Sequence, residues 1–316
     1  MNHRHWLLGA LCPLSLWAFA RLLSWANERR TLNERPYRTA MVEGACIHYR
    51  DEGQGPAVVL IHGMGGSLSN FRRTFELLVQ AGFRVLAVDL LGFGYSDRAL
   101  WADLSPQGHA RTIVALMDEV GVGRASLIGH SLGGAIALHL AYRYPERVER
   151  LVLVSSAVPG RLIPGLLRPI WWDPVLEVIV SFCLHFWPVR EMLWRGGVYD
   201  ATTLTPELRE AMRRPSLIRG STRAMVATGK ALLREAPLKL QEIRHPVLIL
   251  WGAEDSWLDL RSAYRLISSL PNARLRIVPR ARHMVLEERP EEAHAEILAF
   301  LTQKLTPTLC HGDLLS

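Results

Sequence analysis

Apolar runs and helical repeats alternate along most of the chain from about Pro36 onward. The runs that read as strands buried on both faces of a sheet lie at 56–63, 83–90, 124–130, 150–157, 245–252 and 273–279. Segments with helical spacing lie at 70–81, 105–120, 132–144, 259–270 and 290–305. An earlier stretch, 40–53, has the pattern of a hairpin of two short strands. Strands that alternate with helices predict an α/β fold with a mainly parallel sheet flanked by helices.

The alternation breaks between residues 158 and 242. This interval holds several apolar helical pieces rich in Trp, Leu and Arg, and it shows no strand pattern. Because it is too long for a plain loop between two strands, we expect an inserted helical cap. The sequence therefore predicts a core made of 37–157 and 243–305, a cap at 158–242 and a loose tail at 306–316.

The first 36 residues have a pattern of their own. A basic start is followed by the uncharged apolar run Trp6–Ala20 and later by a polar stretch. This order is typical of a signal peptide, and the apolar residues from 6 to 26 are also nearly enough to span a bilayer as a retained anchor. A buried helix of the folded domain is the alternative. We expect residues 1–36 to hold a signal peptide or membrane anchor and a linker, and the protein to be membrane-anchored or exported.

Charge and cysteine content narrow the choice of partners. The formal net charge is +7, and six Arg against two Glu within residues 1–38 place +4 of it near the N-terminus. Elsewhere no run of Lys and Arg is interleaved with aromatic residues, so we expect no nucleic-acid partner. The cysteines, Cys12, Cys46, Cys183 and Cys310, lack the spacing of a metal site. We expect neither a metal nor another cofactor, and the sequence predicts no oligomeric state.

One short pattern points to nucleophilic catalysis. Residues 129–133 read Gly-His-Ser-Leu-Gly, with an apolar strand before them and a helix of small residues after them. In such a strand-to-helix turn, glycines allow the backbone to approach closely and the serine hydroxyl stands clear of the sheet. The N-terminus of the following helix directs backbone N–H groups at developing negative charge. We expect Ser131 to be a nucleophile that a base activates.

With its further motifs, the sequence resembles the α/β-hydrolase fold family over nearly all of residues 37–305. These motifs are His-Gly-Met-Gly-Gly at 62–66, Asp-x-x-Gly-x-Gly-x-Ser at 89–96, Gly-Ala-Glu-Asp at 252–255 and a histidine after the last strand. In this family the nucleophile, the acid and the histidine follow one another along the chain. The resemblance thus implies a triad of Ser131, Asp255 and His283, with Glu254 as the alternative acid.

The same resemblance implies where negative charge is held during the reaction. The two donors would be the backbone N–H groups of Leu132, directly after the nucleophile, and of Met64, in the loop after the first parallel strand. His62 and the loop 89–96 match parts of the family that are usually structural. We therefore leave both out of the expected catalytic set.

Four tryptophans stand close together in the predicted cap, at Trp171, Trp172, Trp187 and Trp194. Side chains of this kind either form the cap's own small core or line an apolar pocket for substrate. We expect some of the four to bind substrate, and the alternative of a packing role stays open.

The resemblance implies a serine hydrolase that works through an acyl-enzyme, without a cofactor. We expect an esterase or lipase that cleaves carboxylic esters of apolar small molecules or lipids. The alternatives are a carbon–carbon bond hydrolase, an acyltransferase or thioesterase, and a hydrolase-fold binding or receptor module. The apolar N-terminus weighs against the first of these, because carbon–carbon hydrolases of aromatic degradation work in the cytoplasm.

Overall fold

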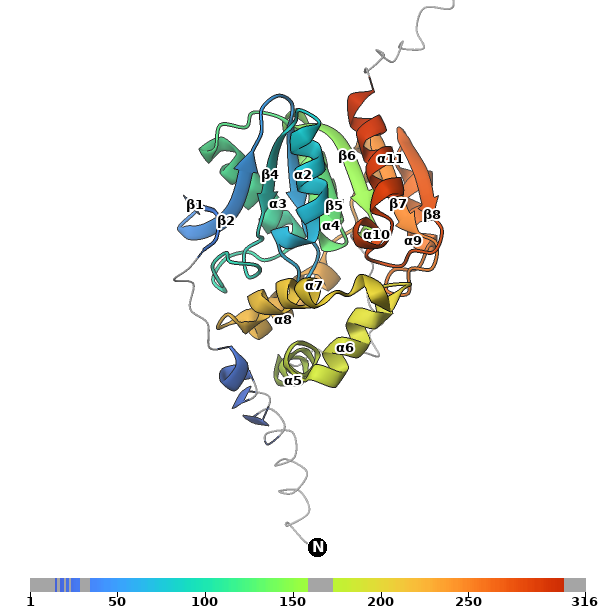
Figure 1. Ribbon diagram of the computed structural model, residues 1–316. Helices are drawn as coiled ribbons and strands as arrows, with labels where there is room; N and C mark the ends of the chain where they lie inside the picture. Colours follow the sequence, from blue (N-terminus) through green and yellow to red (C-terminus); the bar gives the residue numbers. More distant parts are fainter. Residues whose placement is uncertain are drawn as a thin grey trace, which may run out of the picture.

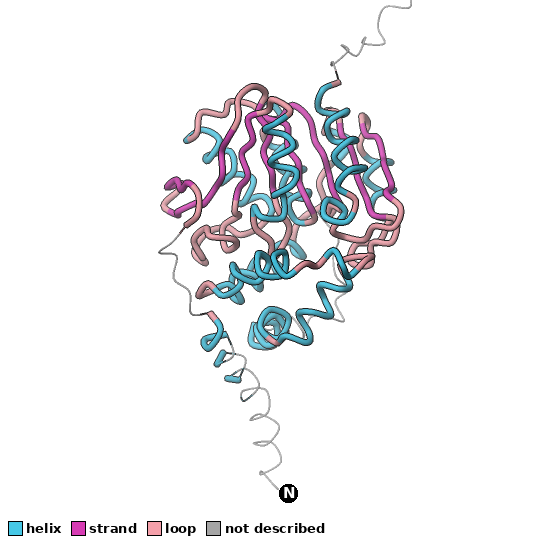
Figure 2. Tube along the Cα trace, in the orientation of Figure 1, coloured by secondary structure: helices cyan, strands magenta, loops and turns pink. Residues whose placement is uncertain are grey.

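A computed structural model describes residues 15, 18–19, 21–22, 24–28, 35–158 and 173–303. Within this part of the chain, an eight-stranded sheet has the order β1-β2-β4-β3-β5-β6-β7-β8 (Figures 1 and 2). The strands are β1 (Arg38–Val42), β2 (Ala45–Glu52), β3 (Ala57–Ile61), β4 (Arg84–Val88), β5 (Ala125–His130), β6 (Val148–Val154), β7 (Val247–Gly252) and β8 (Ala273–Val278). The first two strands pair antiparallel, as do β2 and β4, and all other neighbours are parallel. The predicted α/β class with a mainly parallel sheet is confirmed.

The parallel strands are buried on both faces because helices cover each side of the sheet. In β3, Val59 and Ile61 belong to one core cluster and Val58 and Leu60 to another, and all four are fully buried. The helices of the first layer are α3 (Pro106–Glu119), α4 (Leu132–Arg143) and α9 (Arg261–Ser269), and those of the second are α2 (Arg72–Gln80), α10 (Val285–Glu288) and α11 (Pro290–Thr302). Two apolar faces explain why these strands read as continuous apolar runs.

In the described part of the interval predicted for the cap, four further α-helices lie between β6 and β7. They are α5 (Asp173–His185), α6 (Trp187–Gly196), α7 (Pro206–Arg213) and α8 (Ser221–Arg234). Local signals fix their starts: α7 begins with Pro206 after Thr205, whose hydroxyl accepts the N–H of Leu208 at 3.3 Å. Figures 1 and 2 show the four helices across one edge of the sheet. They cover the loops at that edge.

The expected membrane location is overturned. In the described part of the chain, no helix combines the length and apolar character needed to cross a bilayer. Of the residues described before β1, Ser24 and Glu28 are buried against α5 and α8 and make polar contacts there, which a lipid-embedded segment would not offer. Much of the run 6–20, on which the signal-peptide or anchor prediction and the membrane partner depended, lies outside the described residues.

Candidate active site

The carboxyl ends of the parallel strands bring the predicted residues to one edge of the sheet. The loop 62–66 and Ser131 follow β3 and β5, which are neighbours in the sheet. Asp255 and His283 follow β7 and β8, which are neighbours as well. Ligands bind at this edge in open α/β sheets, because the connecting loops converge there.

Ser131 occupies a strained turn between β5 and α4. Its φ of 53° lies in the left-handed region that residues with a side chain rarely adopt. Two glycines make the turn possible by close packing: a Cβ on Gly129 would lie 2.3 Å from the carbonyl oxygen of Gly133, and one on Gly133 would lie 2.0 Å from that of Ile61. The turn places the serine at the N-terminus of α4, where the first backbone N–H groups have no partner within the helix.

Asp255 and His283 form a buried hydrogen-bonded pair. The His283 Nδ1 donates to Asp255 Oδ2 at 2.9 Å, because a carboxylate can only accept. Asp255 Oδ1 also accepts the backbone N–H groups of Trp257 and Leu258, at 2.9 and 3.0 Å. Burial alone would raise the pKa of the Asp255 carboxyl, but His283 and the two N–H donors outweigh it and lower that pKa. The carboxylate thus stays ionised and leaves Nε2 of His283 as the nitrogen that can accept a proton.

The alternative acid, Glu254, has another partner. Its Oε2 accepts the backbone N–H of Ala281 at 3.2 Å, in the loop that leads to His283. The geometry therefore brings Asp255 and not Glu254 to the histidine.

His62 holds the loop that carries Met64 in place. His62 donates from Nδ1 to the carbonyl of Gly63 at 2.7 Å and accepts the N–H of Leu90 at Nε2, at 3.0 Å. Burial lowers the pKa of His62, so this ring is neutral and both contacts are satisfied. The ring therefore connects the loop to the end of β4.

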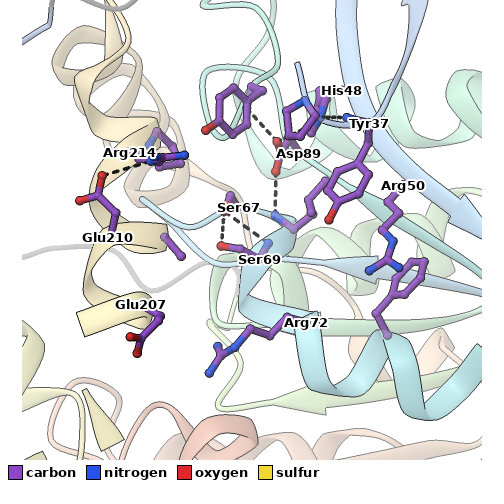
Figure 3. Close-up of a pocket in the computed structure, with 16 residues that line it drawn as sticks. Tyr37, His48, Arg50, Ser67, Ser69, Arg72, Asp89, Glu207, Glu210 and Arg214 are labelled. Carbon is purple, nitrogen blue, oxygen red and sulfur yellow. Dashed lines mark hydrogen bonds and ion pairs between the residues drawn. The ribbon is translucent and has the colours of Figure 1, made fainter. Parts of the chain in front are cut away.

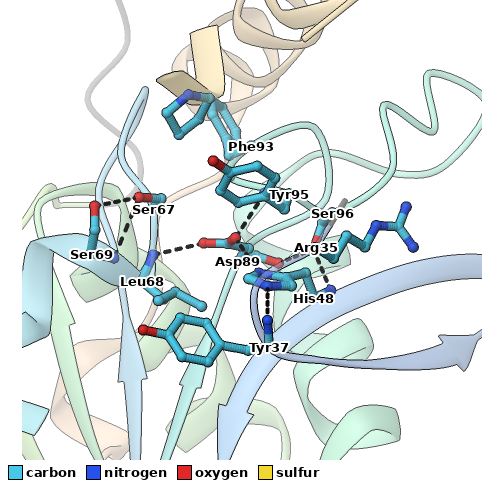
Figure 4. Close-up of polar contacts among 12 residues, drawn as sticks. Arg35, Tyr37, His48, Ser67, Leu68, Ser69, Asp89, Phe93, Tyr95 and Ser96 are labelled. Atoms are coloured by element: carbon cyan, nitrogen blue, oxygen red, sulfur yellow. Dashed lines mark hydrogen bonds and ion pairs between the residues drawn. The ribbon is translucent and has the colours of Figure 1, made fainter. Parts of the chain in front are cut away.

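Asp89 is the centre of a second set of contacts to the same loop (Figure 4). It is fully buried, and it accepts the backbone N–H groups of Leu68 and Tyr95 at 2.7 Å each and the Nδ1 hydrogen of His48 at 2.7 Å. Burial would raise the pKa of the Asp89 carboxyl, but the His48 contact and its other partners lower it. Together with His62, it fixes both ends of the loop 62–68.

A cavity of about 370 Å³ lies between these loops and the cap. Its lining from the sheet edge includes Met64, Ser131 and His283, and its lining from the cap includes Trp194 and Met225. The side chain of Leu132 is buried in the core, and its backbone N–H belongs to the first turn of α4, directly after Ser131. A largely apolar lining with a few polar groups is the usual composition of a small-molecule pocket.

The four tryptophans predicted to contact substrate differ in their positions relative to the cavity. Trp194 lines the cavity. Trp187 does not: it is 65% exposed at the first turn of α6, because that turn faces away from the core. Trp171 and Trp172 lie outside the described residues. Trp187 is therefore not part of this cavity, and whether it contacts substrate stays a prediction.

Several lining residues did not emerge from the sequence. Trp257 packs against His283 with ring centroids 4.9 Å apart, and its position two residues after the acid was the signal that could have identified it. His130 donates from Nε2 to the carbonyl of His283 at 3.0 Å, and burial, assisted by the nearby His283, lowers the pKa of His130 to about 3. Met225 and Met284 reach the cavity from α8 and from the residue after His283. No local pattern marks either methionine.

A second cavity, of about 410 Å³, lies beside the same loop (Figure 3). Ser67 and Ser69 line it, whereas Ser131 does not. Its arginines are compensated by carboxylates: Arg50 pairs with Glu52 and Glu76, Arg72 with Glu287, and Arg214 with Glu210. Of these two cavities, the first is the one lined by both Ser131 and His283.

Comparison with known proteins identifies relatives over most of the chain. A model of the alpha/beta hydrolase fold family matches residues 56–290. A 2-hydroxy-6-oxononadienedioate/2-hydroxy-6-oxononatrienedioate hydrolase of Burkholderia vietnamiensis is 32% identical, over 81% of this chain and 90% of that protein. A 2-hydroxy-6-oxo-6-phenylhexa-2,4-dienoate hydrolase of Comamonas testosteroni is 31% identical, over 82% and 92%. The solved structure of a meta-cleavage product hydrolase from Pseudomonas fluorescens is similar with a TM-score of 0.70 at 26% identity, over 84% and 97%.

These relatives correct the expected activity. That the chain is a hydrolase is confirmed, but the compounds in the relatives' names contain an enol, a ketone and carboxylates and no ester linkage. The interpretation as an esterase or lipase is therefore wrong. The carbon–carbon bond hydrolase that stood as an alternative fits the relatives better, and the argument against it from a membrane location has been removed.

Proposed function

Because the chain belongs to the α/β-hydrolase fold family, we propose that it is a carbon–carbon bond hydrolase of 2-hydroxy-6-oxo-dienoates or close analogues. The observation that carries the proposal is the similarity, 32% identity over 81% of the chain, to a hydrolase named for such a compound. The hydrogen-bonded pair Asp255–His283 beside Ser131 supports it, because attack on a ketone needs an activated nucleophile.

The chemistry of such a compound requires a particular sequence of bond changes. The only carbonyl open to nucleophilic attack is the 6-ketone, and carbon 5 can leave only if its electron pair is delocalised. Transfer of the proton of the 2-hydroxyl group to carbon 5 gives a 2,6-diketone in which a double bond joins carbons 3 and 4. The electron pair of the bond between carbons 5 and 6 then passes through that double bond to the oxygen on carbon 2.

The described residues can serve each step. We assign the transfer of the 2-hydroxyl proton to Nε2 of His283. Ser131 Oγ then attacks carbon 6 while the same nitrogen takes its proton, and the backbone N–H groups of Met64 and Leu132 hold the resulting oxyanion. Collapse breaks the bond to carbon 5, and the proton on Nε2 of His283 passes to the oxygen on carbon 2. A 2-hydroxydienoate is released, an ester is left on Ser131, and the histidine is again free to act as a base. Water, deprotonated by His283, hydrolyses this ester to a carboxylic acid and restores the serine.

The size and character of the cavity agree with this class of substrate. Its volume of about 370 Å³ lies in the range of roughly 300–1,000 Å³ typical of small-molecule pockets. Trp194 and Trp257 offer aromatic faces to a flat conjugated chain, and Met212 and Met225 offer adaptable apolar contacts.

The direct test is turnover of 2-hydroxy-6-oxo-6-phenylhexa-2,4-dienoate by the purified chain. The loss of absorbance of the conjugated substrate is followed, and the products are identified by chromatography. We expect one benzoate and one 2-hydroxypenta-2,4-dienoate for each substrate consumed. Ser131→Ala should lower kcat by at least about 10³-fold. The matched control is Ser268→Ala, because Ser268 is an exposed serine of α9 that only contacts a backbone carbonyl.

Failure to consume this dienoate and its aliphatic dioate analogues, with Ser131 still reactive toward a fluorophosphonate, would contradict the proposed substrate class. Turnover that survives in Ser131→Ala would contradict the assigned nucleophile.

A further inference from the structure

A buried carboxylate connects the segment before β1 to the cap. Glu28 is 6% exposed. It accepts the backbone N–H of Gly220 at 2.8 Å and both the N–H and the hydroxyl of Thr222, at 2.9 and 2.6 Å. Nε2 of His185 on α5 lies 3.4 Å from it. Its partners are thus more than 150 residues away in sequence and lie on α5 and at the start of α8.

Glu28 occupies the position of a capping group for α8. The helix begins at Ser221, and Gly220 before it has a left-handed φ of 96° and no side chain to cap the first turn. A carboxylate at this end satisfies unpaired N–H groups and interacts favourably with the helix dipole. Burial alone would raise the pKa of Glu28, but His185, Thr222 and the N–H of Gly220 outweigh it and lower that pKa.

Ser24, one helical turn earlier, strengthens the same junction. It is buried, and its hydroxyl lies 2.9 Å from that of Ser181 on α5 and 3.1 Å from that of Thr222 on α8. Figure 1 shows the short N-terminal helical pieces beneath these cap helices and away from the hairpin of β1 and β2 that follows them in the chain. Ser24 and Glu28 together are called the N-terminal clamp below.

The helix that the clamp holds packs directly on the loop with the expected oxyanion donor. A Cβ on Gly65 would lie 2.6 Å from Cε of Met225, and one on Gly229 would lie 4.0 Å from Sδ of Met64. The helix α8 and the loop that holds Met64 and Gly65 are therefore in direct contact.

A second path runs from the same end of α8 to the far end of that loop. Arg98 donates to Ser221 Oγ at 3.1 Å and to the carbonyl of Gly94 at 2.9 Å. The next residue, Tyr95, donates its N–H to Asp89, and Asp89 also accepts the N–H of Leu68 (Figure 4). The start of α8 and the loop 62–68 are thus joined through packing and through hydrogen bonds.

We propose that the N-terminal clamp is a positioning device for catalysis: Glu28 and Ser24 fix α8 so that Met64 presents its backbone N–H to the oxyanion. The proposal rests on the proposed function for the role of Met64. The clamp lies before residue 56, where the match to the family begins.

The test uses the full-length chain and the rate at which a fluorophosphonate labels Ser131, since phosphonylation also builds negative charge in the oxyanion site. We expect Glu28→Ala to slow labelling by roughly ten-fold, because small displacements of positioning groups have effects of this order. Glu28→Gln keeps one acceptor oxygen and should recover part of the rate, and Ser24→Ala should lose less than Glu28→Ala. Arg21→Gln is the matched control, because the Arg21–Glu177 pair is exposed and makes little contribution.

Amide hydrogen exchange separates positioning from general destabilisation. In Glu28→Ala, amide exchange should become faster in residues 63–68 and 221–229 and stay unchanged in β5 and β7. If Glu28→Ala does not fold, Ser24→Ala is measured in its place. Labelling within two-fold of the unmodified chain, or exchange that rises equally in the strands, would overturn the proposal. Rapid labelling of Ser131 without turnover of any dienoate would contradict the proposed function, and the effect of the clamp variants on the labelling rate could still be measured. Absence of Ser131 labelling in the unmodified chain would overturn both.

Discussion

The contacts of Asp255 allow its catalytic part to be separated from its structural part by one substitution. Its Oδ1 accepts the N–H groups of Trp257 and Leu258, and its Oδ2 accepts Nδ1–H of His283. In Asp255→Asn the amide oxygen can keep both backbone contacts, so the loop should hold its shape. The amide NH₂ group then meets Nδ1, which must become an acceptor, and the ring proton moves to Nε2, the atom assigned to take the proton of the nucleophile.

The expected result is a fall in kcat on the order of 10⁴-fold, or about 5 kcal/mol, with a small change in thermal midpoint. The measurement is steady-state turnover of the phenyl dienoate together with a thermal melt. Asp259→Asn is the matched control, because Asp259 lies four residues on and its carboxylate contacts the backbone N–H and the exposed guanidinium of Arg261, at 2.8 and 3.9 Å. A loss below ten-fold in Asp255→Asn would refute the assignment of the acid. An equal loss in Asp259→Asn would assign the effect to the loop.

Three further outcomes follow from described contacts. In Gly133→Ala, the new methyl group would lie 2.0 Å from a carbonyl oxygen at the end of β3, so we expect little folded protein, measured as a lost cooperative melt. Trp257→Ala should raise KM for the phenyl dienoate by roughly ten-fold, whereas Trp187→Ala, at an exposed position, should not, and equal effects would contradict the cavity assignment. His109 is buried, neither ring nitrogen has a partner in the described part of the chain, and burial lowers its pKa to about 3. Because the unfolded chain binds a proton on this histidine near pH 6.5 and the folded chain does not, the free energy of unfolding should fall as pH drops from 6.5 toward 3. In urea denaturation, His109→Leu should raise the free energy of unfolding by about 1–3 kcal/mol and weaken its dependence on pH. An unchanged pH dependence would contradict the argument.

The sheet and the loops at its edge could be predicted because their signals are local. Strands such as 57–61 are apolar on both faces, and residues that follow parallel strands are brought to one edge whatever the packing above it. The family resemblance named Asp255 and His283 among the residues at this edge, and the structure brings them within hydrogen-bond distance. The choice between Asp255 and Glu254 depended on the resemblance until the contact with Ala281 was known.

The failures concern interactions between distant parts of the chain. Trp187 and Trp194 both lie on α6, and composition does not tell which of its faces meets the cavity. An apolar N-terminus is typical of a membrane segment, and the partners that bury Ser24 and Glu28 lie more than 150 residues later. The substrate class was mispredicted because ester and carbon–carbon hydrolysis begin with the same attack on a carbonyl. The triad therefore does not distinguish them.

The cap helices are inserted in the chain between β6 and β7, and this order has a consequence for the protein during its synthesis. The proposed nucleophile and oxyanion donors follow β3 and β5, whereas the proposed acid and base follow β7 and β8, which the ribosome makes last among the described strands. A nascent chain can therefore fold its serine turn and still lack any base to activate it. If the proposed triad is correct, the protein cannot hydrolyse its substrate until translation is almost complete, and a truncated product that ends within the cap would have no activity.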